Sequence, residues 1–348
     1  MMVTDIVTRL PRPTAELPRL RLAQLPTPLE EARRLSEALG GPRIYFKRDD
    51  LTGAALGGNK VRKLEFVIGR ALAEGADSLV VCGGFQSNLA RIAAAVGNRQ
   101  GLEVVLVLGG EPGERREPIG NLLLDRLYGV KVHTVDTTPR WEFGTVVEDV
   151  AADLRRRGKR PFVVPLGGSG PEGMAGYVSA TEELLGQLTA LNLCPSRLYV
   201  AIGSGGTFCG LLLGALNQGA SYQVVGISVS RTRAYLLEQL PLAAATAADA
   251  LGLAGAPTSS DMDVDDAFIG EGYGVVTQGC REAMAIVART EGVLLDPVYS
   301  GKAMHGLIEH IRRGRIAAHE SVIFLHTGGW PALFAYDPVS LGIGESHG

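Results

Sequence analysis

Short runs of β-branched and other apolar residues alternate with amphipathic segments along most of this 348-residue chain. This alternation predicts an α/β fold with parallel sheets, because helices that cover both faces of a sheet leave its strands apolar on both sides. Strands are expected at 78–82, 103–108, 130–135, 161–164, 197–202, 223–229 and 321–326. Helices are expected around 88–99, 120–128, 144–157, 172–191, 207–217, 278–291 and 301–313.

Two glycine-rich breaks, at 53–58 and 167–173, separate the chain into blocks with comparable numbers of strand signals. This layout predicts two open twisted sheets, one in a larger domain made of residues 1–56 and 168–348 and one in a smaller inserted domain at 57–167. The active site is expected in the cleft between them. The stretch 243–265, rich in Ala, Thr, Ser, Asp and Pro, predicts a loop or mobile lid.

Composition excludes several classes of partner. The net charge is −3 and no long basic run occurs, which argues against nucleic acid and anionic membranes. No apolar run is long enough to span a bilayer, and the N-terminal segment lacks an apolar leader. The four cysteines show no paired spacing, and Cys82 and Cys209 lie in apolar runs where buried thiols are expected. A cytoplasmic protein with a small substrate is therefore expected.

The segment 57–63, Gly-Gly-Asn-Lys-Val-Arg-Lys, introduces a run of apolar residues with helical spacing that ends at Gly75. Lys60 then lies in the first turn of a helix. The positive end of the helix dipole and the cations of Arg62 and Lys63 would disfavour its ammonium form, so that the neutral amine could attack an aldehyde. Lys60 is thus a candidate Schiff-base lysine, and the alternative is an ordinary solvated lysine.

A glycine-rich turn at 203–207 follows a predicted strand and opens a helix, a geometry that suits a phosphate group. Phe208 stands where a dinucleotide fingerprint has its third glycine, and no acidic residue occurs between Cys209 and Leu237 to hold a ribose. A nucleotide site is therefore disfavoured. A glycine turn without a ligand remains the alternative.

The segment 83–91 repeats this geometry, with Ser87 or Asn88 as the N-cap of the next helix. Gln86, Ser87 and Asn88 could form a pocket for a carboxylate at that helix start, and the alternative is a capped helix without a ligand. A phosphate site, a carboxylate site and a reactive amine together indicate a phosphorylated aldehyde cofactor that acts on an amino acid.

Nine segments occur in the order found in one known family: 25–29, 47–52, 57–65, 86–88, 165–169, 203–207, 272–274, 296–302 and 326–329. Over residues 20–337 the chain resembles the D-cysteine desulfhydrases and 1-aminocyclopropane-1-carboxylate deaminases. These are pyridoxal-phosphate enzymes of the tryptophan synthase β fold type, also called fold type II. The resemblance implies pyridoxal 5'-phosphate as the cofactor, a small amino acid as the substrate and a homodimer as the assembly.

The resemblance also implies roles for individual residues. Lys60 would form the Schiff base and move the α-proton, while the phosphate would be held by Lys63, Ser204, Gly205, Gly206 and Thr207. Asn88 would face the ring hydroxyl, and Thr327 would meet the pyridine nitrogen. The substrate carboxylate would be held by Gln86, Ser87 and Asn88, and the reacting carbon would be bordered by Tyr273 and Tyr299.

Two positions separate the relatives. The deaminases carry Glu and Leu where this chain has Ser300 and Thr327, which favours the desulfhydrase reaction, with Ser300 among the substrate-binding residues. The expected reaction is α,β-elimination of D-cysteine to pyruvate, ammonia and hydrogen sulfide. Opening of the cyclopropane ring, elimination from cysteate and racemisation remain alternatives, and a non-catalytic amino-acid sensor is the non-enzyme alternative.

Three residues depart from the family pattern: Leu89, Gly170 and Trp330. Leu89 and Trp330 could make the substrate pocket narrower or more apolar, although Trp330 could equally pack away from any ligand. No metal is expected, because His305, Glu309 and His310 lack the spacing of a zinc site. His326 is expected to be a hydrogen-bonded core residue.

Overall fold

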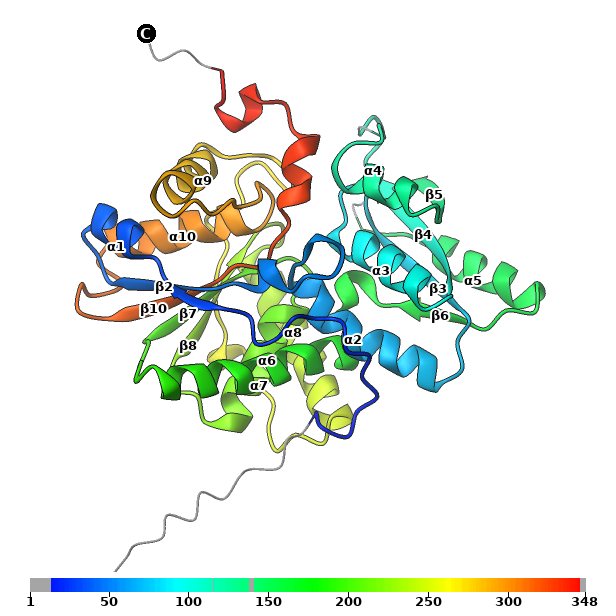
Figure 1. Cartoon of the computed structure of the whole chain (residues 1–348), viewed down its shortest axis with the longest axis horizontal. Helices are drawn as coiled ribbons and strands as arrows, with labels where there is room; N and C mark the ends of the chain where they lie inside the picture. Colours follow the sequence, from blue (N-terminus) through cyan, green and yellow to red (C-terminus); the bar gives the residue numbers. More distant parts are fainter. Residues whose placement is uncertain (1–13, 115, 138–140, 345–348) are drawn as a thin grey trace, which may run out of the picture.

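The computed structural model describes residues 14–114, 116–137 and 141–344. They form two sheets, one with strands in the order β1-β2-β10-β7-β8-β9 and one in the order β5-β4-β3-β6 (Figure 1). The strands of the second sheet all lie between residues 78 and 164. This is the arrangement that an inserted unit at 57–167 would give, and the predicted domain boundaries themselves stay a prediction.

The six-stranded sheet is built from β1 (Leu29–Glu31), β2 (Arg43–Lys47), β7 (Arg197–Ile202), β8 (Gln223–Ser228), β9 (Asp263–Asp265) and β10 (Ser321–Leu325). All neighbouring strands are parallel except β1, which pairs antiparallel with β2. The expected all-parallel pattern is therefore wrong at this one edge. An antiparallel edge strand on a parallel sheet is common in large α/β folds.

Helices cover both faces of this sheet. One face packs on α6 (Pro171–Ala190), α7 (Gly206–Gln218) and α8 (Arg233–Ala250), and the other on α1 (Arg33–Leu39), α9 (Gln278–Glu291) and α10 (Ser300–Arg312). Successive residues of β7 enter opposite cores, since Leu198 and Val200 join the first core and Tyr199 joins the second. This is the period-two pattern that a strand covered on both faces requires.

The four-stranded sheet contains β3 (Ser78–Gly84), β4 (Glu103–Gly110), β5 (Lys131–Asp136) and β6 (Pro161–Val164). Helices α2 (Asn59–Ala73), α3 (Asn88–Arg99) and α4 (Gly120–Leu127) pack on one face and α5 (Val146–Arg156) on the other. Leu79 and Val81 enter the first core, whereas Val80 enters the second. The strands and helices of this sheet match the predicted segments within one or two residues.

The prediction of a loop or lid at 243–265 is wrong for residues 243–250 and 263–265, whereas the residues between them lie outside the α-helices and strands. Residues 243–250 form the end of α8, where Ala244, Ala247 and Ala248 are buried at helical spacing against the core. Residues 263–265 form β9, the edge strand beside β8. Small residues favour close helix packing as readily as they favour loops, and the composition of the segment did not separate the two.

Within the described residues, no helix has the length and apolar character needed to cross a membrane.

Candidate active site

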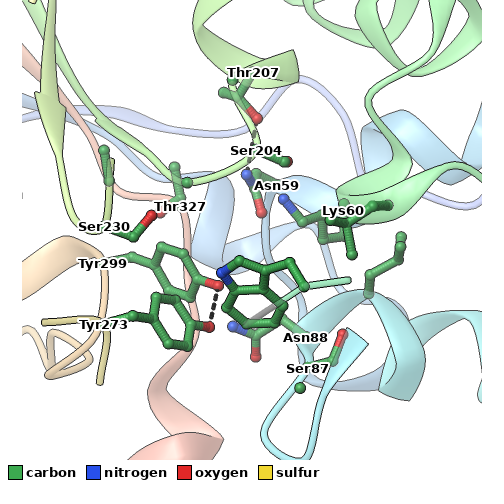
Figure 2. A pocket seen from close by; sticks show the side chains of 18 of the residues that line it. Asn59, Lys60, Ser87, Asn88, Ser204, Thr207, Ser230, Tyr273, Tyr299 and Thr327 are labelled. Atoms are coloured by element: carbon green, nitrogen blue, oxygen red, sulfur yellow. Dashed lines mark hydrogen bonds between the residues drawn. The ribbon is translucent and has the colours of Figure 1, made fainter. Parts of the chain in front are cut away.

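A cavity opens at the carboxyl ends of the strands of both sheets, where ligands bind in open α/β folds (Figure 2). On the side of the four-stranded sheet, the end of β3, the start of α3 and the segment after β5 contribute Cys82, Gly84, Ser87, Asn88, Leu89 and Trp141. From the six-stranded sheet, the loops after β7, β8 and β10 contribute Gly203, Ser204, Gly205, Thr207, Ser230, Arg231, Thr327 and Gly328. Lys60 enters from the first turn of α2.

The backbone before Lys60 is fixed to the end of strand β10. The Asn59 N–H donates to the Thr327 carbonyl at 3.0 Å, and the Asn59 side chain donates to the Thr207 hydroxyl at 2.9 Å. Gly57 and Gly58 both have positive φ, and a Cβ on Gly57 would overlap the carbonyl oxygen of Asp50. Glycine is therefore required here so that α2 can begin against the large sheet.

Burial lowers the pKa of Lys60 to about 8, because the ammonium form loses its hydration. The expected direction of this shift is confirmed, but one expected cause is wrong. Arg62 lies 2.9 Å from Asp49 and 2.8 Å from Glu183, and these carboxylates offset its charge. Lys60 is thus a partly buried amine with a much larger neutral fraction near neutral pH than an exposed lysine has.

The turn at 203–207 leads into α7, whose N-cap, Gly205, has φ of 85° and provides no side-chain cap. The first N–H groups of α7 therefore lack a side-chain acceptor and can bind an anion. A Cβ on Gly206 would lie 2.7 Å from the Lys63 amine and 2.5 Å from the Ser169 hydroxyl. Glycine at this position lets the helix start and the lysine approach each other closely.

Lys63 lies behind this turn and is fully buried. Its amine donates to the Gly167 carbonyl at 2.6 Å and to the Ser169 hydroxyl at 3.1 Å, and it forms no ion pair among the described residues. Burial, together with the charge of Lys60, places the pKa of Lys63 well below its ordinary value. A dianion at the start of α7 would supply the counter-charge that this amine lacks.

Two tyrosines form a hydrogen-bonded pair in the cavity, with the hydroxyls of Tyr273 and Tyr299 at 2.5 Å. Burial raises the pKa of Tyr299 to about 12 and that of Tyr273 well above its ordinary value. Both hydroxyls therefore keep their protons at neutral pH. Figure 2 shows the pair on the opposite side of the cavity from Lys60.

Trp141 was missed in the sequence, although it is one of only two tryptophans. Its indole lines the cavity and packs edge-on against Tyr273, with ring centroids 4.7 Å apart and an interplanar angle of 88°. Its φ is 77°, an unusual value for a bulky residue, and such strain concentrates at functional sites. Its position just beyond the carboxyl end of β5 was the available signal.

The structure brings most of the predicted site residues together around the cavity: Lys60, Ser87, Asn88, Ser204, Gly205, Thr207, Tyr273, Tyr299 and Thr327. Ser87 is the N-cap of α3, accepting from the Ala90 N–H at 3.1 Å. Lys63 and Gly206 lie directly behind the glycine turn instead of on the cavity wall.

Gln86 and Ser300 are not among the cavity-lining residues. The Gln86 side chain donates to the Ile119 carbonyl and accepts from the Asn121 N–H, so it holds the start of α4. The buried Ser300 hydroxyl donates to Asp296 at 2.6 Å. Local hydrogen-bond partners thus turn both side chains away from the position expected for substrate binding.

Of the three positions that depart from the family pattern, one lines the cavity and two do not. Leu89 is buried and lines the cavity, while Gly170 and Trp330 are not among the lining residues. Besides Trp141, the sequence reasoning missed Asn59, Ser230 and Arg231, which line the cavity beside predicted residues. Ser230 and Arg231 follow the end of a predicted strand, which was the available signal.

The three histidines considered in the sequence make contacts within the fold. His326 is buried, accepts from the Gly328 N–H at 3.2 Å and donates to the Leu294 carbonyl at 2.9 Å, as expected of a core histidine. His310 bonds to Tyr199 and Asp265, and His305 packs on Phe268. The described part of the chain contains no group of three or more potential metal ligands.

The sequence is similar to enzymes that bind pyridoxal phosphate. A family model described as "Pyridoxal-phosphate dependent enzyme" matches residues 20–328. A D-cysteine desulfhydrase of Salmonella typhi is 41% identical over 326 residues, which cover 92% of this chain and 97% of that protein. A putative 1-aminocyclopropane-1-carboxylate deaminase of Pyrococcus abyssi is 38% identical over 322 residues, covering 92% and 94%.

The fold is also similar to solved structures. A crystal structure described as an ACC deaminase homologue superposes with a TM-score of 0.86 at 35% sequence identity, covering 95% of this chain and 97% of that one. An O-ureido-L-serine synthase superposes with a TM-score of 0.65 at 16% identity, covering 94% and 95%, which shows likeness of fold alone. Both matches agree with the predicted fold type.

Proposed function

Because the chain belongs to the family of pyridoxal-phosphate-dependent enzymes, we propose that it is a lyase that carries out α,β-elimination on a small amino acid. The favoured substrate is D-cysteine, which with water yields pyruvate, ammonia and hydrogen sulfide. The observation that carries this proposal is the protonated Tyr273–Tyr299 pair across the cavity from Lys60. Elimination needs a base at one carbon and a proton donor at the leaving group, and this arrangement provides both.

The residues of the cavity fit the cofactor of this family. Its phosphate would be held by the uncapped start of α7 and by Lys63, a buried amine that has no carboxylate partner among the described residues. Its aldehyde would be reached by the Lys60 amine. Its ring nitrogen would meet the Thr327 hydroxyl, a neutral partner, and its ring hydroxyl would meet Asn88.

When bound to an amino acid, pyridoxal phosphate withdraws electrons from Cα and so makes the α-proton acidic. Lys60 is the residue we propose to accept that proton, since burial lowers its pKa to about 8 and leaves part of it neutral. A base whose pKa lies near the working pH combines a useful neutral fraction with adequate basicity. An exposed lysine would be almost fully protonated and far less effective.

The tyrosine pair is the proposed proton donor to the leaving sulfur. The two hydroxyls are hydrogen-bonded to each other at 2.5 Å. When one of them gives up its proton, the other stabilises the phenolate that results. The raised pKa values keep both groups protonated until a thiolate leaves. Protonation of the sulfur prevents its return to the β-carbon.

The substrate carboxylate is proposed to lie at the start of α3, where Ser87 caps the helix and Asn88 begins it. Exposed N–H groups and the helix dipole favour an anion at that point. The apolar residues Leu89, Trp141 and Leu166 line the same cavity. They limit the space beyond the β-carbon and therefore favour a short side chain.

Opening of 1-aminocyclopropane-1-carboxylate is the second candidate, because a relative with that name is 38% identical to this chain. Thr327 argues for elimination, because a neutral hydroxyl at the ring nitrogen weakens the cofactor as an electron sink. A weak sink suits prompt loss of a leaving group better than a long-lived carbanion.

We also propose that the enzyme is a homodimer and that it acts in the cytoplasm.

A panel of substrates tests the proposal. Purified holoenzyme is mixed in turn with D-cysteine, L-cysteine, 1-aminocyclopropane-1-carboxylate and cysteate, and sulfide, sulfite, keto acid and racemised amino acid are measured. Sulfide and pyruvate from D-cysteine in a one-to-one ratio are expected. The proposed reaction would be wrong if the only product were keto acid from the cyclopropane substrate, sulfite from cysteate, or racemised amino acid. Binding of a ligand without any product would indicate a sensor.

A further inference from the structure

Arg91 is among the largest fully buried side chains of the protein, although it carries a charge. It lies on α3, one turn after Asn88, with its guanidinium directed between the start of that helix and the loop that precedes Lys60. Fully buried arginines are rare unless paired. The contacts of this side chain therefore require an explanation.

The guanidinium joins three segments that meet at the cavity. Its Nη1 donates to Asn88 Oδ1 at 2.8 Å and to Asn121 Oδ1 at 2.6 Å, and its Nη2 donates to the Gly57 carbonyl at 2.9 Å. Asn121 in turn donates to Asn88 Oδ1 at 3.0 Å. The side-chain oxygen of Asn88 thus accepts two hydrogen bonds from the protein.

This pattern fixes which end of the Asn88 amide remains for a ligand. Because its oxygen is taken by Arg91 and Asn121, its NH₂ group is left as a hydrogen-bond donor at the cavity wall. An ionised ring oxygen of the cofactor needs a donor. A flipped amide would instead present its oxygen and repel that anion.

A second buried ionisable group interacts with Arg91. Asp125 on α4 is fully buried, and neither carboxylate oxygen has a hydrogen-bond partner, nor does Arg91 Nε. Arg91 acts electrostatically on Asp125, and burial raises the pKa of this carboxyl to about 7. A carboxyl with this pKa is only partly ionised at neutral pH and offsets part of the charge of Arg91, so its removal alone would leave the buried guanidinium with less compensation.

We propose that Arg91 is a positioning residue that aims the amide of Asn88 at the ring oxygen of the cofactor and holds the Gly57 carbonyl, and with it the loop leading to Lys60. Arg91 touches neither the cofactor nor the substrate in this scheme, and it acts through Asn88 and Gly57. The inference rests on the proposed roles of Lys60 and Asn88, and not on which amino acid is the substrate.

Two variants test the positioning role of Arg91. Arg91→Lys keeps a positive charge near Asp125 but cannot serve both Asn88 and Gly57, since it lacks the planar fork of donors. Arg91→Met combined with Asp125→Asn removes both buried charges together, so that neither is left behind uncompensated, and it serves as the second variant if the lysine variant is unstable. Arg99→Lys, on the exposed last turn of the same helix, is the matched control.

The first readout is the pH titration of the visible absorption of the bound cofactor, measured without substrate. Loss of a donor to the ring oxygen raises the pKa of that chromophore, and an increase of about one unit is expected in both Arg91 variants. The dissociation constant of the cofactor should rise about tenfold, and kcat should fall more than KM changes. The control variant should match the parent protein in each measurement.

The outcomes separate this inference from the proposed function. If both Arg91 variants keep the parent's titration and cofactor affinity and only their melting temperatures drop, Arg91 is structural and the inference is overturned. Borohydride reduction and peptide mapping of the parent protein report independently on Lys60. A tag at Lys60 with unshifted Arg91 variants refutes the positioning role alone, and a tag elsewhere refutes the proposed site.

Discussion

The hydroxyl oxygens of Tyr273 and Tyr299 lie 2.5 Å apart, and both groups are held in their protonated forms by burial. The two residues come from different parts of the chain, one from the loop before α9 and one from the start of α10. The hydrogen bond couples two neutral phenols, so that a change in the protonation of one alters the acidity of the other. The pair therefore makes the most direct prediction about the chemistry.

Replacing Tyr273 or Tyr299 with Phe should lower kcat for D-cysteine about 100-fold, because a positioned proton donor contributes on that scale. KM should change little. β-Chloro-D-alanine needs no proton on its leaving group and serves as the control substrate, for which both variants should keep most of their turnover. An equal loss on the two substrates would show that the tyrosines do not protonate the leaving group.

Lys60→Ala should abolish turnover and also the covalent attachment of the cofactor. The measurement is borohydride reduction followed by peptide mapping, together with a keto-acid assay. Lys131→Ala, which removes an exposed lysine from β5, is the control and should behave like the parent protein. Near-normal turnover in the Lys60 variant would contradict the proposed role.

The pKa of Lys60 predicts how the protein without cofactor captures the aldehyde. Only the neutral amine attacks, so the rate should rise with pH and level off above a pH of about 8. A stopped-flow record of the growing visible absorption, taken at constant excess of pyridoxal phosphate, measures this rate. An exposed lysine would show a rate that still climbs toward a pH of about 10.

Trp141→Ala should widen the substrate pocket. The ratio of kcat/KM for S-benzyl-D-cysteine over that for D-cysteine is expected to rise about tenfold, the scale of a change in one apolar pocket contact. Trp330→Phe changes the other tryptophan, which is not among the cavity-lining residues, and should leave the ratio unchanged. If Trp330→Phe raises this ratio and Trp141→Ala leaves it unchanged, the assignment of Trp141 to the pocket wall is wrong.

Asp49 predicts a large effect on stability away from the chemistry. Its carboxylate is fully buried and accepts from Arg62 at 2.9 Å, from Tyr177 at 2.7 Å and from Thr27 at 2.8 Å. Asp49→Ala should lower the free energy of unfolding by about 3 kcal/mol, because the charge of Arg62 loses a buried partner. Urea unfolding measures the loss, and the exposed Asp249→Ala should change it by less than about 0.5 kcal/mol.

Much of the fold could be predicted because its signals are local. Strands such as β6 and β7 are continuously apolar and were placed at their observed bounds. Strands β1 and β9 have three residues each and exist only through pairing with β2 and β8, so no local pattern marks them. Helix α8 contains Pro241 and a stretch of small residues, and its packing on the core outweighs the loop-like composition.

The site residues also fall into those that local sequence signals reveal and those that depend on tertiary contacts. Lys60, Ser87 and the glycine turn at 203–207 sit beside strand ends and helix starts, which sequence patterns reveal. The orientations of the Gln86 and Ser300 side chains depend on hydrogen bonds to Asn121, 35 residues away, and to Asp296, four residues away. No sequence motif shows which hydrogen-bond partner each side chain takes. Trp141 reaches Tyr273 only after both sheets are folded, so its role follows from the tertiary structure.

The hydrogen bond from the Asn59 N–H to the Thr327 carbonyl has a mechanical consequence. One backbone hydrogen bond joins Asn59, the neighbour of the proposed Schiff-base lysine, to Thr327, the proposed partner of the ring nitrogen. Helix α2 packs on the four-stranded sheet, and this hydrogen bond ties its first residue to the segment that follows β10 of the six-stranded sheet. The two sheets are therefore linked beside the proposed Schiff-base lysine, and a shift of one sheet against the other would be transmitted to Lys60 through this contact.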